Sequence, residues 1–262
     1  MYLGLEDKHA LVLGGSQGLG LASAQALLNE GARVTLSGRS LERLEAARTA
    51  LPAEQQARCF IAVADLADAE AASLIAQRAR AEGGVVDVLV NNSGGPPPGL
   101  PSAITAVAMA DHFASMVQPV VTLTLELLPT MRERGWGRIL TIASSGVVQP
   151  IPHLPMSNAL RSTLVGFMKS LAGEVAGDGV TVNMVLPGRI ATGRTQSIDA
   201  DQAQKSGKPV EEIARASTAS IPAGRYGTPE EFAAVVAFLA STQASYVTGS
   251  MMRVDGGAIR SI

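Results

Sequence analysis

Seven short apolar runs, separated by segments of helical length, constrain the fold of this chain more than any other feature. They are rich in Val, Ile and Leu, and turn residues follow them. Such strands alternating with helices are typical of a parallel sheet covered on both faces. The runs are "ALVLG", "RVTLSG", "CFIAVA", "VDVLVNN", "GRILTIAS", "VTVNMVLPG" and "SMMRVDGG". We therefore predict one α/β domain over residues 1–262, with a doubly wound (Rossmann) fold and a seven-stranded parallel sheet.

The region 191–226 interrupts this alternation. It combines "TGRTQS" with a helical "PVEEIARAST" and contains no apolar run of strand type. Irregular insertions within a compact domain are often mobile covers over a binding site. We predict that residues 191–226 form a substrate-covering segment.

Charge and cysteine content limit the possible partners. The 262 residues include 23 acidic and 21 basic side chains, so the net charge of -2 favours neither nucleic acid nor a membrane surface. A small-molecule substrate is the expected partner. The only cysteine, Cys59, lies in a strand-like run, which excludes an intrachain disulfide and a thiolate metal cluster and predicts a buried thiol; no metal site is expected. The N-terminal residues do not resemble a signal peptide, and no apolar stretch could span a bilayer, so a cytoplasmic location is expected.

A glycine-rich turn, "LGGSQGLG", lies between the first strand and the first helix. Glycines there let the backbone turn sharply and approach a phosphate, and a helix N-terminus attracts a pyrophosphate. The sequence therefore predicts a dinucleotide site. The expected contacts are Gly14, Ser16, Gln17, Gly18, Leu19 and Gly20.

The end of the second strand indicates which dinucleotide is preferred. A carboxylate at this position would bind a ribose 2′-hydroxyl, but the sequence has Ser37, Gly38 and Arg39. A guanidinium suits a 2′-phosphate. NADP(H) is therefore predicted over NAD(H).

With these motifs, the chain resembles the short-chain dehydrogenase/reductase family, in its 3-oxoacyl-carrier-protein-reductase-like branch. The resemblance runs from end to end, through "GGSQGLG", "ADL", "NNSG", "GRILTIASS", "VTVNMVLPGRIAT" and "VTGSMMRVDGG". It implies adenine contacts at Asp65 and Leu66. It further implies that the cofactor is lined by Asn91, Ser93 and Gly94 and that the segment from Pro187 through Gly188 and Ile190 to Thr192 holds its carboxamide.

The catalytic tetrad of that family is Asn, Ser, Tyr and Lys, and only its serine is retained here. Ser144 occupies the serine position, whereas the family spacing puts Ser157 at the tyrosine, Arg161 at the lysine and Met116 at the asparagine. Residues four apart on a helix share a face, so Ser157 and Arg161 are expected to point together into the site. A serine hydroxyl is a far weaker acid than a phenol, and arginine keeps its proton under ordinary conditions.

The proton donor is therefore open at this stage. His153, in "QPIPHLPM", could serve if it reaches the pocket, although a lone loop histidine is more often solvated. His9, placed before the first strand, and His112, in a helix of unassigned orientation, are weaker candidates. The proline-rich "SGGPPPG" is expected to stiffen the pocket rim.

Three functions fit these residues. The first is an NADP(H)-dependent oxidoreductase acting on a small carbonyl or alcohol, with Ser144 and Ser157 binding the oxygen and Arg161 holding ribose and charge. The second is a non-redox lyase, dehydratase or isomerase in which Arg161 stabilises an enolate. The third is a catalytically silent nucleotide-binding module. The resemblance further implies a homotetramer, or a homodimer, in which long helices over 102–134 and 157–176 pair between subunits.

Overall fold

The computed structural model describes residues 2–261. Their strands form one parallel seven-stranded sheet in the order β3-β2-β1-β4-β5-β6-β7, which confirms the predicted Rossmann fold. Every residue of β1 is buried, as expected for a strand covered on both faces. The strands are β1 (His9–Leu13), β2 (Arg33–Gly38), β3 (Cys59–Val63), β4 (Val88–Asn91), β5 (Gly137–Ile142), β6 (Val180–Pro187) and β7 (Met251–Val254).

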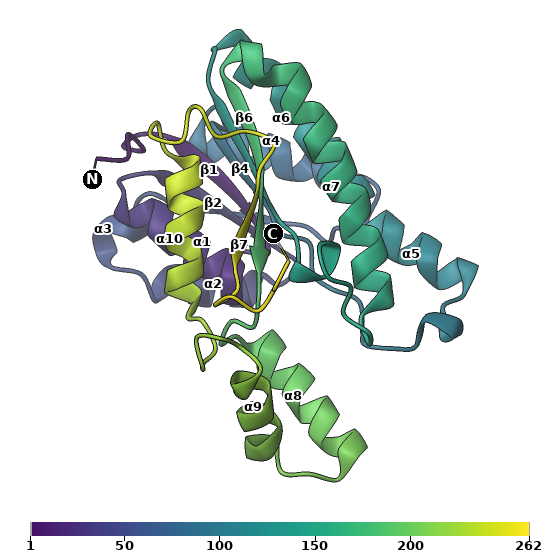
Figure 1. The fold of residues 1–262 in the computed structure, drawn as a ribbon. Coiled ribbons are helices and arrows are strands. Elements are labelled where there is room, and N and C mark those ends of the chain that lie inside the picture. The colour runs from purple at the N-terminus through teal and green to yellow at the C-terminus, as the bar shows by residue number, and fades with distance from the viewer. Residues whose placement is uncertain (1, 262) are drawn as a thin grey trace.

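Helices cover both faces of the sheet and enclose two apolar clusters. On one face α1 and α10 pack side by side, and on the other α4, α6 and α7 lie over the strands (Figure 1). The covering helices are α1 (Gly18–Asn29), α2 (Leu41–Thr49), α4 (Ala71–Gly83), α6 (Gln118–Glu133), α7 (Pro155–Val175) and α10 (Pro229–Ala240). Short elements complete the layers: α3 (Ala53–Gln56) and the 3₁₀ turns η1 (Pro101–Ala103), η2 (Ser145–Val147) and η3 (Ala176–Asp178).

Local sequence explains where several helices begin and end. Thr228 and Glu231 form a reciprocal capping box at the start of α10, and Ser40 caps α2 through the amide of Arg43. The chain leaves α1 through Gly31, whose φ of +85° is in the region that favours glycine. Gly31 thus returns the chain to β2, which begins at Arg33.

The stretch expected to be one long helix over 102–134 is two helices. α5 spans Ala106–Met116 and α6 begins at Gln118, with Val117 between them at φ -105° and ψ -56°. Pro119 lacks the amide hydrogen that would continue the hydrogen-bond ladder, and its ring crowds the preceding turn. The second expected helix, 157–176, begins earlier, at Pro155, a favourable first helical residue.

The region 191–226 contains two helices, α8 (Gly193–Ser206) and α9 (Val210–Ala219). Figure 1 shows them projecting beyond the end of the sheet, below β6 and α10. None of the helices within residues 2–261 is long and apolar enough to cross a membrane.

Candidate active site

A cavity of about 1140 Å³ opens at the carboxyl ends of the strands. Its walls follow β1, β2, β4, β5 and β6, with α5, α7 and α8 closing the sides. β1 lies between β2 and β4, so the chain order reverses at this point of the sheet. Ligands of open α/β sheets bind at such switch points.

The glycine turn forms the floor of this cavity and has the shape that a phosphate requires. Gly14 and Gly18 have φ of +60° and +56°, and a Cβ atom on Gly20 would lie 2.2 Å from the Gly14 carbonyl oxygen. Gln17 caps α1 without any side-chain hydrogen bond, so the first amides of the helix stay available to an anion. The lining residues predicted from this turn are Gly14, Ser16, Gln17, Gly18 and Leu19; Gly20 acts through its close approach to Gly14.

The end of the cavity next to β2 and β3 carries the residues expected to select the nucleotide. Arg39 lines it and is exposed, and the cation Arg43, which was not predicted, lines it too. Asp65 and Leu66 lie in the same wall, where Asp65 Oδ1 accepts a hydrogen bond of 3.1 Å from the amide of Ala67.

The loop after β4 differs by one residue from the expectation. Asn91 does not line the cavity: its side chain is buried, and Nδ2 donates to Thr124 Oγ1 at 3.1 Å. Asn92 lines the cavity in its place, because successive residues of a strand face opposite sides. Ser93 and Gly94 also line it, and their contact with a cofactor stays a prediction; Ser93 Oγ is buried without a hydrogen-bond partner in the described structure.

Ser144, Ser157 and Arg161 all line the cavity. Ser144 follows β5, and its Oγ accepts a hydrogen bond of 3.0 Å from the amide of Gly146. Ser157 lies in the first turn of α7 and is 7% exposed. The one-turn spacing from Ser157 to Arg161 therefore brings both side chains to this cavity, as the sequence predicted.

Three backbone carbonyls hold the Arg161 guanidinium. Nη1 donates to Ile142 O at 2.8 Å, and Nη2 donates to Gly94 O at 2.8 Å and to Ser93 O at 3.2 Å. Burial, with a smaller contribution from Arg194, lowers the pKa of Arg161 to about 10. Arg161 therefore stays charged at neutral pH while it ties β5 to the loop after β4.

His153 lines the cavity from an exposed loop. Its backbone carbonyl accepts a 3.0 Å hydrogen bond from the amide of Gly99, so this loop and the proline-rich loop meet at the rim. His112, Ser115 and Met116 reach the cavity from α5. His112 lies three residues before Ser115 and four before Met116, so the three side chains share one face of α5. This spacing, together with the predicted site position of Met116, could have placed His112 at the cavity.

The segment after β6 completes the wall with Pro187, Gly188, Ile190 and Thr192, and its predicted role in holding the cofactor's carboxamide stays a prediction. Arg189 also lines the cavity, and a residue of α8 holds its side chain in place. Its Nη1 donates to Asp199 Oδ1 at 2.7 Å, and Tyr226 Oη donates to Asp199 Oδ2 at 2.7 Å. Asp199 is almost fully buried, so this cluster fastens α8 to the ends of β6 and α10. Arg194 at the start of α8 is a further lining residue that the sequence did not indicate.

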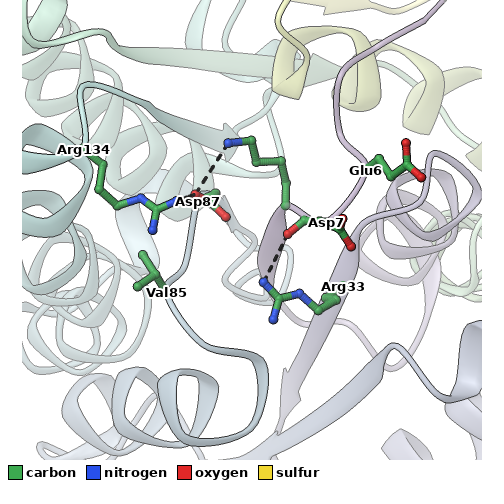
Figure 2. Close-up of a pocket in the computed structure, with 7 residues that line it drawn as sticks. Glu6, Asp7, Arg33, Val85, Asp87 and Arg134 are labelled. Atoms are coloured by element: carbon green, nitrogen blue, oxygen red, sulfur yellow. Dashed lines mark hydrogen bonds and ion pairs between the residues drawn. The ribbon is translucent and has the colours of Figure 1, made fainter.

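A second, smaller cavity of about 290 Å³ lies beside the start of β1 and β2. Figure 2 shows Asp87 between Arg134 and the residues of the N-terminal segment, with Arg33 directed at Asp7. Acidic and basic side chains are mixed in this cavity, and it contains none of the predicted site residues. The larger cavity is therefore the candidate active site.

The glycine turn at a switch point of a parallel sheet defines a dinucleotide-binding α/β protein. A family model described as "Enoyl-(Acyl carrier protein) reductase" matches residues 14–258. The chain is 36% identical over 258 residues to the 3-oxoacyl-(acyl-carrier-protein) reductase FabG of Escherichia coli, covering 97% of this chain and 98% of that protein. The chain belongs to the short-chain dehydrogenase/reductase family of oxidoreductases.

Two solved structures show the same fold with nucleotide bound. The L-sorbose reductase of Gluconobacter frateurii, complexed with NADPH and L-sorbose, is 31% identical with a TM-score of 0.94, and each chain is covered completely. An actinorhodin polyketide ketoreductase with NADPH is 33% identical with a TM-score of 0.90, covering 96% of this chain and 97% of that one.

Proposed function

We propose that this protein is an NADP(H)-dependent oxidoreductase that acts on a small carbonyl or alcohol. The observation that carries the proposal is the joint position of the glycine turn and Arg39 in one cavity with Ser144 and Ser157. The first two suit a phosphorylated dinucleotide, and the hydroxyls suit an oxygen of a substrate.

The described residues fit this cofactor. Only glycine is compatible with the close approach at Gly20, and no side chain caps the first amides of α1, which leaves them available to a phosphate. Arg39 would hold the 2′-phosphate, with Arg43 as a second cation in the same wall. When bound, NADP(H) would supply or accept the hydride. The NADPH complexes of two similar reductases support this choice.

Ser144 and Ser157 would orient the reacting oxygen by hydrogen bonds. Ser157 and Arg161 occupy the proposed positions of the family's tyrosine and lysine, and Met116 that of its asparagine. Arg161 would hold a fixed positive charge near the oxygen, because its position is set by three carbonyl partners. It would not release a proton in the working pH range.

The proton would come from His153 or from water held by the two serines. His153 lies on the cavity rim, and histidine side chains are common general acids in enzymes. Residues 191–226 would cover the bound substrate, since Arg194 and Ile198 of α8 already face the cavity. The proposed assembly is a homotetramer or homodimer formed through α6 and α7.

The test is NADPH oxidation by the native protein on a panel of activated ketones and aldehydes, beside the double variant Ser157→Tyr with Arg161→Lys. A reductase with a weak proton donor should gain turnover in the double variant, because general acid–base catalysis contributes about 10² to 10⁴ in rate. Folding and nucleotide binding of the double variant are measured in parallel, since a phenol must fit beside Met116. A native protein without any NADPH oxidation, together with an active double variant, would contradict the proposed function.

A further inference from the structure

Two arginines from distant parts of the sequence meet on one side of Gly95. A Cβ atom built there would lie 3.3 Å from Arg194 Nη2 and 3.8 Å from Arg161 Nη2. Arg161 comes from α7 and Arg194 from the first turn of α8, and both line the candidate active site. The loop after β4 therefore places two positive charges side by side in the cavity.

Neither guanidinium is paired with a carboxylate in the described part of the chain. Arg161 donates to three carbonyls, and Arg194 Nη2 donates to Pro96 O at 2.7 Å. By contrast, Arg189, in the same wall, is paired with Asp199. The acidic residues that line the cavity, Glu42 and Asp65, follow β2 and β3 at the other end of the sheet order.

Two unneutralised cations at close range are unfavourable to each other. Arg194 adds to the effect of burial in lowering the pKa of Arg161. A guanidinium carries several N–H donors in a planar fork that matches a carboxylate or phosphate, and Arg194 spends one of them on Pro96. An anion held between the two arginines would remove their repulsion and fill the remaining donors.

The position of this arginine pair favours contact with the substrate over contact with the cofactor phosphates. Arg161 lies one turn after Ser157, whose hydroxyl would hold the reacting oxygen, whereas the start of α1 offers its own amides to a pyrophosphate. We propose that Arg194 and Arg161 form an oxyanion-binding position for the substrate, so that the preferred substrate carries a carboxylate or phosphate close to its reacting carbonyl or hydroxyl. This inference rests on the proposed function.

The first experiment measures binding without turnover. Malonate and inorganic phosphate are titrated calorimetrically into the protein saturated with NADP⁺, using the native chain, Arg194→Met, Arg194→Lys and the control Arg78→Met. Arg78 is an exposed arginine of α4 outside the cavity. Arg194→Met should weaken malonate binding roughly tenfold or more, because a charge-assisted hydrogen bond is lost, and Arg194→Lys should restore part of it. Arg78→Met should bind like the native protein.

Two results would overturn this inference. The first is a native, nucleotide-loaded protein that binds neither malonate nor phosphate. The second is an Arg194→Met variant that loses NADP⁺ affinity by the same factor as the anion, which would assign the guanidinium to the cofactor pyrophosphate. Thermal unfolding of each variant checks that the fold is retained.

Turnover then separates this inference from the proposed function. Rates with NADPH are compared for pyruvate and methyl pyruvate, which differ in the presence of the negative charge. Arg194→Met should lower kcat/KM about tenfold more for pyruvate than for the ester, because only pyruvate carries the negative charge. Malonate binding that depends on Arg194 without NADPH oxidation of any carbonyl would contradict the proposed function and support the anion site. Equal losses for acid and ester would contradict the anion site alone.

Discussion

His9 Nε2 lies 2.9 Å from Thr35 Oγ1, inside the sheet where β1 pairs with β2. The sequence placed His9 before the first strand, but it is the first residue of β1 and is fully buried. Its Nδ1 lies 3.1 Å from the Gly84 carbonyl, and burial lowers the pKa of the ring below its ordinary value. Neutral His9 is therefore part of the folded state.

We predict that His9 makes the protein less stable in mild acid. Because the folded pKa lies below that of the unfolded chain, the unfolded chain binds the proton first as the pH falls. The contribution of neutral His9 to stability is complete at a pH above the pKa of the unfolded chain, which is ~6.5. It is lost as the pH falls from there towards the pKa of the folded state. Urea unfolding of native protein and His9→Gln at pH 8 and pH 5.5 tests this. The variant should be about 1–3 kcal/mol less stable at pH 8, with the gap narrowing at pH 5.5. A constant gap would contradict the prediction.

Arg39 should determine nucleotide preference. Arg39→Ala should raise the Kd for NADPH roughly tenfold or more and change that for NADH little, because only NADPH has the 2′-phosphate. Calorimetry with both nucleotides measures this. Arg48→Ala, an exposed change on α2 outside the cavity, is the matched control. Equal affinities of the native protein for the two nucleotides would remove the basis for choosing NADP(H).

Two glycine substitutions in helices should have opposite effects. Gly20→Ala places a Cβ atom 2.2 Å from the Gly14 carbonyl oxygen and should disrupt nucleotide binding and destabilise the fold by more than about 1 kcal/mol. Gly173→Ala, in α7 with open space around it, should stabilise by about 0.5–1 kcal/mol, because glycine is a poor helix former. Thermal unfolding and nucleotide titration of both variants provide the comparison.

Asp199 should hold the segment 191–226 in place. Asp199→Ala leaves Arg189 and Tyr226 without their shared carboxylate. Removing one partner of a buried ion pair lowers the free energy of unfolding by about 3–5 kcal/mol. We expect a loss of about 3 kcal/mol here, because Arg189 is partly exposed. Hydrogen exchange should accelerate in α8 and α9. The control Asp201→Ala removes an exposed pair with Lys205 and should cost less than about 0.5 kcal/mol. Unchanged exchange in α8 after Asp199→Ala would contradict this role.

The sequence predicted the sheet and the glycine turn because both depend on local signals. Continuous apolar runs specify buried strands, and Gly14, Gly18 and Gly20 specify a tight approach between strand and helix. The break at Val117 could also have been predicted, since Pro119 is visible in the sequence. The sequence analysis named Asn91 where the cavity wall has Asn92. Successive residues of a strand face opposite sides, so an error of one residue at the end of β4 selects a side chain on the wrong face.

The position of Arg194 in the site depends on tertiary contacts. Arg194 reaches the cavity only because the Asp199 cluster fixes α8 beside β6, and its hydrogen bond to Pro96 joins residues that are far apart in the sequence. No local pattern marks Arg194. Arg43, by contrast, lies in the first turn of α2, whose start is set by the local cap at Ser40.

Cys59 allows opening of the sheet edge to be measured by thiol labelling. The thiol, confirmed as buried, lies on β3, which pairs only with β2 at the end of the strand order, and burial raises its pKa to about 11. A thiol that is both inaccessible and protonated does not react with alkylating reagents. Since the chain has no other cysteine, labelling reports only openings that expose this position of β3. The native protein therefore carries an intrinsic reporter of this edge, and comparing its labelling rate with the rate of global unfolding shows whether the edge opens by itself or only with the whole domain.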